Sequence, residues 1–282
     1  MQKRVAAIHD ISCFGKCSLT VALPVISAAG IEASVIPTAV LSTHTGGFAG
    51  FTYRDLTDDI LPVVRHWQTL DLKFDAVYTG FLGSFEQIDI MTEVFAALKT
   101  PDNLILVDPV MADNGKLYSI FPPDFPEGMK KLCAYADIIV PNMTEAALLV
   151  GDEYREGPYD KAYIEELMER LAETGPQRVV LTGVYFDDEE LGAAVCENGA
   201  VTYLMSSRIE GYYHGTGDLF ASALLAGVLT GLSLAEAAQA AITLTVESIL
   251  RTRAAGTDVR FGVNFEAGLA DFAMRLREYG NA

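Results

Sequence analysis

The residues most suited to chemistry lie in the segment His214–Thr230, which reads His-Gly-Thr-Gly-Asp followed by a long apolar run. Gly215 and Gly217 flank Thr216 and predict a turn that leads into a buried helix, since glycine adopts positive φ and has no Cβ to obstruct a ligand. Backbone N–H groups in such a turn, together with the first turn of the helix behind them, can bind an anion such as phosphate.

Asp218 follows this turn directly. A carboxylate repels a bound phosphate, but it is well placed to take a proton from a hydroxyl group that attacks the phosphate. It could equally cap the N-terminus of the helix, with the glycines merely turning the chain. The motif alone leaves both interpretations open.

Three further acids, Asp108, Asp113 and Glu145, lie in polar segments that follow apolar runs. Their hard oxygens suit Mg²⁺, which keeps several waters and also binds substrate phosphates. Two structural alternatives compete with this prediction. Glu145 could cap a short helix over residues 144–149 together with Asn142, and Asp108 could form part of a tight turn before Pro109.

Other polar groups could contact a ligand. Asn142 offers amide donors and an acceptor, while Thr182 and Gly183 can present a hydroxyl and a backbone N–H to a nucleotide. His44 lies between two threonines in a glycine-containing loop, which makes it a candidate for stacking on, or hydrogen-bonding to, a polar ring.

Several familiar motifs are missing. The four histidines have no zinc-binding spacing, and the segment ending in Gly15-Lys16-Cys17 lacks the first glycine and the Ser/Thr of a P-loop. Absence of G-x-S-x-G and of the dinucleotide-binding G-x-G-x-x-G disfavours hydrolase and dehydrogenase functions.

The elements that must position these residues alternate along the chain. This order predicts an α/β fold with three layers, in which helices cover both faces of a mainly parallel central sheet. The turn at Asn198-Gly199 predicts a small hairpin at the sheet edge, and the whole chain, residues 1–282, is predicted to form one domain. We expect strands at 5–8, 32–41, 76–79, 104–107, 137–140 and 178–181, hairpin strands at 191–197 and 200–205, and helices at 19–29, 56–70, 86–98, 125–135, 161–174, 234–253 and 266–279.

In open α/β sheets of this kind, ligands bind outside the carboxyl ends of the strands. The polar clusters at 9–18, 42–48, 79–84, 108–115, 141–145 and 182–183 all follow predicted strands. We therefore expect these clusters and the 215–218 turn to share one crevice.

Composition narrows the possible partners. A formal net charge of -18 argues against nucleic acid and anionic membranes, because both require clustered Lys and Arg. Four scattered cysteines without a C-x-x-C pair predict reduced thiols and a cytoplasmic location. We expect no signal peptide and no membrane span.

The motifs together resemble those of the ribokinase-fold vitamin kinases, and most closely the pyridoxal (pyridoxamine, pyridoxine) kinases. The resemblance extends over nearly the whole chain. It is carried by Ser42-Thr-His-Thr45, Gly80-Phe-Leu-Gly-Ser84, Asp108-Pro-Val-Met111, Pro141-Asn-Met-Thr-Glu145 and Gly215-Thr-Gly-Asp218.

This resemblance implies ATP-dependent phosphorylation of the 5'-hydroxymethyl group of a B6 vitamer, with Mg²⁺, frequently K⁺ or another monovalent cation, and a homodimer. Asp218 would be the catalytic base and also touch the substrate, while the backbone of Gly215, Thr216 and Gly217 would stabilise the transferring phosphoryl group. The remaining residues follow by motif: the vitamer ring at Asp10, Ser12, His44 and Thr45; ATP at Asp108, Asn142, Glu145, Thr182, Gly183, Gly215 and Gly217; the metal at Asp108, Asp113 and Glu145.

Two features depart from the resemblance. Many pyridoxal kinases have a serine where Asp10 stands. A histidine before the glycine turn, as at His214, resembles the motif of the hydroxymethylpyrimidine kinases, in which a cysteine often replaces the acid at the position of Asp218. The alternatives are therefore a hydroxymethylpyrimidine (phosphate) kinase of the same fold, or a non-catalytic nucleotide- or vitamer-binding protein. The segment 113–126, which contains Pro and Gly, is our hypothesis for a mobile cover over the site.

Overall fold

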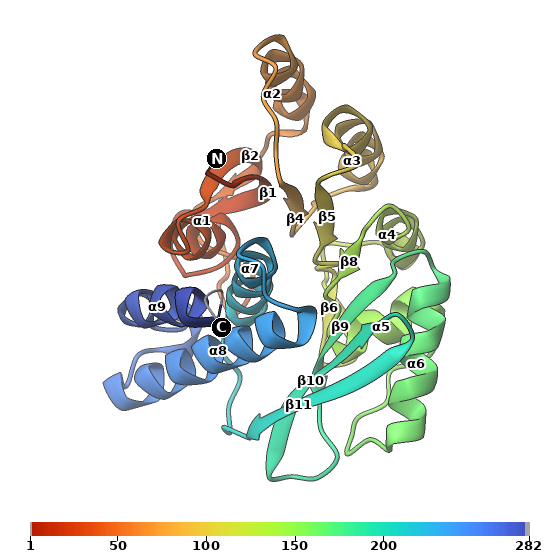
Figure 1. Cartoon of the computed structure of the whole chain (residues 1–282), viewed down its shortest axis with the longest axis vertical. Helices are drawn as coiled ribbons and strands as arrows, with labels where there is room; N and C mark the ends of the chain where they lie inside the picture. The colour runs from red at the N-terminus through yellow and green to blue at the C-terminus, as the bar shows by residue number, and fades with distance from the viewer. Residues whose placement is uncertain (1, 280–282) are drawn as a thin grey trace.

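The computed structural model of the protein describes residues 2–279, and within them one large sheet lies between two layers of helices (Figure 1). Its strand order is β11-β10-β9-β8-β5-β4-β1-β2-β3. The central strands β2, β1, β4, β5, β8 and β9 pair in parallel, so their carboxyl ends meet at one edge. The strands are β1 Arg4–Ser12, β2 Glu32–Leu41, β3 Tyr53–Asp55, β4 Ala76–Thr79, β5 Leu104–Val107, β8 Ile138–Ile139, β9 Arg178–Val184, β10 Glu190–Glu197 and β11 Ala200–Ser207.

Helices cover both faces of this sheet, which confirms the predicted three-layer α/β fold. One apolar core lies between the sheet and α1 (Leu19–Ala28), α7 (Thr216–Leu229), α8 (Leu234–Ala255) and α9 (Leu269–Tyr279). The other lies beneath α2 (Thr57–Thr69), α3 (Phe85–Leu98), α4 (Phe125–Cys133), α5 (Met143–Val150) and α6 (Lys161–Glu173).

The sequence of strand β1 is apolar on both faces because both faces are buried. Val5 and Ala7 face the core with α1 and α7, while Ala6 and Ile8 face the core with α2 and α3. All four side chains are fully buried. Such a strand needs no polar alternation, because neither of its faces meets water.

The predicted edge hairpin is present as β10 and β11, which pair antiparallel at one end of the sheet. Asn198 and Gly199 join them with φ of 54° and 78°, the two positive values that a type I′ turn requires. The prediction from Asn-Gly is therefore confirmed.

Other boundaries differ from the predictions. Strand β1 continues to Ser12, so the first part of the segment predicted as a turn after Ile8 is extended strand. The C-terminal helix begins at Leu269 instead of Glu266, because a separate 3₁₀ turn occupies Glu266–Gly268. The predicted cover, 113–126, overlaps an unpredicted two-stranded sheet, β6 (Ala112–Asp113) and β7 (Lys116–Leu117).

Two further predictions concern the chain as a whole. Among the residues described, no helix is both long enough and apolar enough to cross a lipid bilayer. That the chain forms one domain stays a prediction.

Candidate active site

A cavity of about 700 Å³ opens at the carboxyl ends of the parallel strands. Residues separated by more than 200 positions in the chain meet here because parallel strands end at the same edge of the sheet. All the predicted site residues line this one cavity: Asp10, Ser12, His44, Thr45, Asp108, Asp113, Asn142, Glu145, Thr182, Gly183, Gly215, Thr216, Gly217 and Asp218.

The two glycines of the turn before α7 differ in backbone conformation. Gly215 has φ 75°, and a Cβ there would collide with the backbone carbonyl of Lys16. Gly217 lies within the first turn of α7 and is not among the glycines with positive φ. The positive φ that glycine allows at both positions is therefore adopted by Gly215 and not by Gly217. A Cβ on Gly217 would meet no atom within 4 Å, so the space beside its backbone is open.

The N-terminus of α7 has no side-chain cap. The Thr216 hydroxyl, which could have capped it, instead donates to the carbonyl of Tyr213 at 3.0 Å. The first N–H groups of a helix have no partner inside the helix, and here they face the cavity. An uncapped helix end of this kind is suited to an anion, and anion binding here stays a prediction.

Asp218 is the third residue of α7, in the first turn of the helix, and lines the cavity. The pKa of Asp218 is raised to about 7, chiefly by burial; the backbone N–H of Ser18 lowers it, and the negative charge of Asp10 adds to the rise. A carboxyl group with a pKa near neutrality is suited to accept a proton in one step of a reaction and release it in the next. The alternative that Asp218 only caps α7 finds no support, since no side chain caps this helix.

Ser18 connects the two acids and was missed in the sequence. It is a buried non-glycine residue with φ 53° and ψ −129°, a combination that normally favours glycine. Its N–H lowers the pKa of Asp218 and its hydroxyl lowers that of Asp10, because each hydrogen bond favours the ionised carboxylate. Asp10 also accepts a bond from the Ser12 hydroxyl at 3.2 Å. The unusual backbone therefore directs the N–H and hydroxyl of one residue toward two carboxylates.

His44 is fixed in one tautomer by its two partners. The Gly46 N–H donates to Nδ1 at 3.1 Å, so Nδ1 is unprotonated and Nε2 carries the proton that it donates to the Arg260 carbonyl at 2.6 Å. Burial also lowers the pKa of His44. Both ring nitrogens are therefore occupied, and of the two roles predicted for His44 only stacking through the ring face is available in this geometry.

Asn142 and Glu145 form a capping box at the start of α5. The Asn142 side-chain oxygen accepts from the N–H groups of Thr144 (2.8 Å) and Glu145 (2.9 Å), and Glu145 accepts from the Asn142 N–H at 2.9 Å. The second Glu145 oxygen accepts from the Met111 N–H at 3.1 Å, and the Asn142 amide donates to the Ala112 carbonyl at 2.9 Å. The capping alternative left open by the sequence is thus present, and it also anchors the loop after β5.

Asp108 and Glu145 are both nearly inaccessible to solvent and lie close enough to interact. Burial is the main cause that raises the pKa of each, and the charge of Glu145 adds to the effect on Asp108. Within the described part of the chain, no three His, Cys, Asp or Glu side chains form a ready metal cage. Mg²⁺ does not need one, since it commonly uses one or two carboxylates, several waters and substrate phosphates.

Thr182 and Gly183 lie at the end of β9, beside Asn142. The Thr182 hydroxyl donates to the Pro141 carbonyl at 3.4 Å, a long bond that a ligand could replace. Gly183 has φ 79°, which turns its backbone at the cavity wall.

Part of the cavity wall is apolar, and the sequence analysis missed it. Ile242, Val246 and Ile249 of α8 line the cavity, as do Leu191 and Ile209. Spacings of four and three residues put the α8 side chains on one helix face, which was the available signal. A flat aromatic ring system is the kind of group that such an apolar wall accepts.

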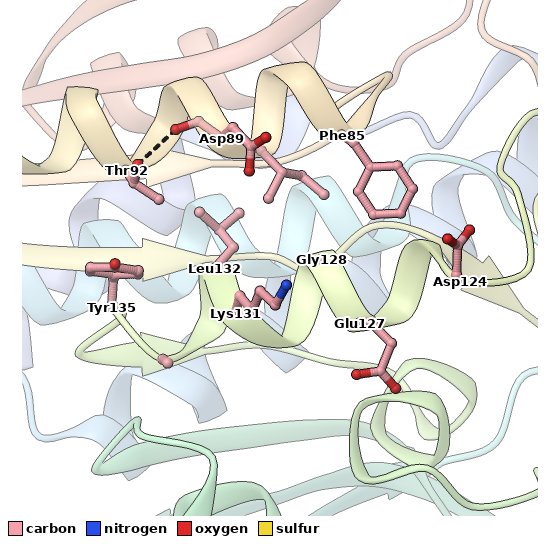
Figure 2. A pocket seen from close by; sticks show the side chains of 11 residues that line it. Phe85, Asp89, Thr92, Asp124, Glu127, Gly128, Lys131, Leu132 and Tyr135 are labelled. Atoms are coloured by element: carbon pink, nitrogen blue, oxygen red, sulfur yellow. Dashed lines mark hydrogen bonds between the residues drawn. The ribbon is translucent and has the colours of Figure 1, made fainter.

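A second hollow, of about 610 Å³, lies on the surface between α3 and α4 (Figure 2). Phe85 and Tyr135 are exposed at its two ends, and the Thr92 hydroxyl donates to the Asp89 carbonyl within α3 at 2.7 Å. None of the predicted site residues lines it. The candidate active site is therefore the cavity at the strand ends.

Comparison with known proteins agrees with this assignment. The family described as phosphomethylpyrimidine kinase matches residues 21–262. A Bacteroides thetaiotaomicron VPI-5482 protein, crystallised in an orthorhombic form with pyridoxal, is 34% identical with a TM-score of 0.92 over 96% of each chain. Pyridoxal kinase from Lactobacillus plantarum is 31% identical with a TM-score of 0.89 over 99% of each chain. A pyridoxine/pyridoxal/pyridoxamine kinase of Bordetella avium is 28% identical over 89% of this chain and 86% of its own.

Proposed function

The chain belongs to the phosphomethylpyrimidine kinase family, and we propose that it transfers the γ-phosphoryl group of ATP to the 5'-hydroxymethyl group of pyridoxal, pyridoxamine or pyridoxine. One observation carries this proposal: Asp218 stands beside the uncapped N-terminus of α7, so that a base and an anion site lie next to each other. The similarity to kinases of B6 vitamers and to a protein crystallised with pyridoxal supports the choice of substrate.

In the proposed complex the adenine ring lies against the apolar part of the cavity wall, beside α8 and the edge hairpin. Thr182 and Gly183 flank the nucleotide, and its phosphates point toward Gly215 and Gly217. Phosphoryl transfer depends chiefly on alignment and on stabilisation of charge, and the open helix end supplies both.

The vitamer would lie between the early loop and the 42–48 loop. His44 offers its ring face, while Thr45 and the acid–hydroxyl pair Asp10 and Ser12 offer hydrogen bonds to the substituents of the ring. Its hydroxymethyl group would then point to Asp218. Asp218 takes the hydroxyl proton as the oxygen attacks the γ-phosphorus, and the bond from that phosphorus to the β-phosphate oxygen breaks.

We propose that Asp108, Asp113 and Glu145 hold Mg²⁺, partly through water. The donor set fits a hard cation: Asp108 is buried, has no Lys or Arg partner among the described residues, and its pKa is raised by burial and by neighbouring negative charge. Bound there, Mg²⁺ would neutralise phosphate charge. Asn142 would contribute by holding Glu145 and the loop after β5 in place.

A homodimer and a monovalent cation such as K⁺ rest on the resemblance alone. Light scattering at several protein concentrations tests the dimer, and turnover measured in KCl against tetramethylammonium chloride tests the cation. A monomer at every concentration, or equal rates in both salts, would remove the respective proposal.

The decisive experiment is ADP release with Mg·ATP and, in turn, pyridoxal, pyridoxamine, pyridoxine and hydroxymethylpyrimidine. We expect turnover of at least one B6 vitamer. Turnover of hydroxymethylpyrimidine alone would favour the second candidate, a hydroxymethylpyrimidine kinase, which the family match and His214 support. Binding of ATP without turnover of any of the four would favour a non-catalytic binding protein.

A further inference from the structure

The ionisable side chains on the walls of the candidate active site are mostly acidic. Five carboxyl groups line the cavity, and no Lys or Arg is among the described residues that line it. A nucleoside triphosphate brings several more negative charges into this space. Mg²⁺ compensates some of them, but the side chains supply no permanent positive charge of their own.

The nearest basic side chains are paired elsewhere. Arg260, which packs against Gly47, forms an ion pair with Asp258 at 2.6 Å. Lys16 forms an ion pair with Glu266 at 2.9 Å and a hydrogen bond with Asn264 at 3.0 Å. Among the described residues of the cavity wall, this leaves His44 and His214 as the side chains that can gain a positive charge near neutral pH.

His44 is unsuited to that role. To be protonated on both nitrogens it would have to stop accepting the bond from the Gly46 N–H. Its Nε2 already donates to the Arg260 carbonyl. A proton on Nδ1 would therefore leave two donors facing each other inside the protein.

His214 has no such constraint. It directly precedes Gly215, and within the described part of the chain its ring nitrogens make no hydrogen bond. Its ring lies 4.9 Å from that of His44 and 4.8 Å from that of Tyr212. Gly46 leaves room for it, since a Cβ on Gly46 would be 2.5 Å from Cε1.

The groups around His214 shift its pKa in opposite directions. Burial lowers its pKa, as does His44, whereas Asp113 on β6 and Asp258 before the 3₁₀ turn Val259–Phe261 raise it. Tyr212 packs edge-on against the ring, and Arg260 on the neighbouring segment is neutralised by Asp258. The net effect lowers the pKa of His214 and so favours the neutral imidazole, whereas an anion beside the ring would favour its protonation.

From this arrangement we propose that His214 takes up a proton from solvent when the γ-phosphoryl group of ATP binds, and that the imidazolium stabilises the oxygens of the group being transferred. This inference rests on the proposed function. The proton on His214 is not transferred in the reaction: the hydroxymethyl proton goes to Asp218, and the phosphoryl group goes from ATP to the vitamer oxygen, with ADP as the leaving group. His214 would thus be a catalytic residue in addition to Asp218.

Calorimetry without a vitamer tests the proton uptake. Binding of the non-hydrolysable analogue AMP-PNP and of ADP, each with Mg²⁺, is measured at neutral pH in buffers of different ionisation enthalpy. We expect the wild type to take up more protons with AMP-PNP than with ADP. His214→Gln should abolish this difference, while the control His66→Gln, on helix α2 away from the cavity, should retain it. Equal uptake for both nucleotides, or a difference that survives in His214→Gln, would overturn the inference.

A second measurement needs no substitution, in case His214→Gln folds poorly. The chain has four histidines, so the imidazole NMR signals of the wild type can be followed individually. The signal of His214 should move to the imidazolium position on addition of AMP-PNP, and those of His9 and His44 should stay neutral. A His214 signal that stays neutral in the complex contradicts the proposal.

The two proposals fail in distinguishable ways. Wild type that shows the His214 proton uptake but turns over no vitamer would overturn the proposed function and leave the nucleotide role of His214 standing. Normal turnover of pyridoxal without the uptake would do the reverse. If no nucleotide binds at all, both are wrong.

Discussion

Two helices, α5 and α7, begin at the wall of the same cavity, but their N-termini are built differently. At α5, Asn142 and Glu145 form a capping box that satisfies the first N–H groups of the helix. At α7, the N-cap is Gly215, which has no side chain and makes no cap bond. The two helix ends have the same dipole, but the Asn142 side chain occupies the N–H groups of Thr144 and Glu145 at α5, whereas the N-cap of α7 makes no side-chain bond.

The comparison shows that a helix N-terminus becomes an anion site by what its N-cap residue leaves unsatisfied. Capping by Asn142 and Glu145 stabilises α5 and fixes the loop that carries Asp108. The open end of α7 costs stability, and so does the carboxyl group of Asp218 beside it. Such local costs are typical of sites that bind charged ligands.

The largest expected effect comes from removing the base at the open end. Asp218→Asn keeps the size of the side chain but cannot accept the hydroxymethyl proton, so we expect kcat on a B6 vitamer to fall by about 100- to 10,000-fold. Affinity for Mg·ATP should change little. Steady-state kinetics together with nucleotide titration measure both quantities, and a variant with more than a tenth of wild-type kcat would exclude Asp218 as the base.

The same substitution should stabilise the protein without ligands. The pKa of Asp218 is raised to about 7, so between its unfolded value near 4 and about 7 the native state holds a proton that the unfolded state has lost. Stability from this group therefore decreases as pH rises through that range, by roughly 2–4 kcal/mol in total.

Urea unfolding of ligand-free protein at several pH values measures this effect. Asp218→Asn should be more stable than wild type at pH values above the pKa of Asp218, and the difference should disappear toward acid. The control Asp188→Asn changes an acid whose side chain is 92% exposed, and it should give parallel curves. A pH-independent difference for Asp218→Asn would show that its pKa is not raised.

The next largest effects are expected from replacing either glycine at the N-terminus of α7 by alanine. Gly215→Ala forces positive φ on alanine and drives its Cβ into the Lys16 carbonyl, so we expect a loss of about 1–3 kcal/mol and of activity. Gly217→Ala adds a methyl group in open space in a helical turn, so stability should be unchanged or rise by up to about 1 kcal/mol.

The two glycine variants must nevertheless agree in one property. Both place a methyl group beside the N–H groups proposed to bind phosphate, so both should weaken Mg·ATP binding. Thermal unfolding and nucleotide titration of the pair separate the two effects. Unimpaired nucleotide binding by Gly217→Ala would argue that phosphate does not approach this turn.

The sequence predicted the parts of this molecule in which local pattern and tertiary position agree. Strands β2, β4 and β5 are found at their predicted bounds, and β4 and β5 are short apolar runs that are buried almost throughout. Strands β3, β6 and β7, each two or three residues long, were missed. Such short strands have no period to recognise and form only because a partner segment lies beside them.

The same distinction applies to the site. The clusters after each strand were found because parallel topology brings strand ends together, whatever the contacts of each side chain. Ser18 could not be found, since its role depends on a backbone conformation that serine rarely adopts. For Glu145 the sequence left capping and metal binding open, because both uses require a carboxylate at that position.

The smallest expected effect concerns Glu145 at the capped N-terminus of α5, and it tests whether this residue binds the metal or only caps the helix. The chain offers a matched control, since Ser233 and Glu236 form a second capping box at the start of α8, and neither residue lines the cavity. Glutamine can replace glutamate in a capping box, so Glu145→Gln and Glu236→Gln should each cost about 1 kcal/mol or less. Only Glu145→Gln removes negative charge from the cavity, so only it should raise the Mg²⁺ concentration needed for half-maximal turnover, by a few-fold. If both variants leave the Mg²⁺ requirement unchanged, Glu145 acts as a cap alone, and the proposed metal site reduces to Asp108 and Asp113.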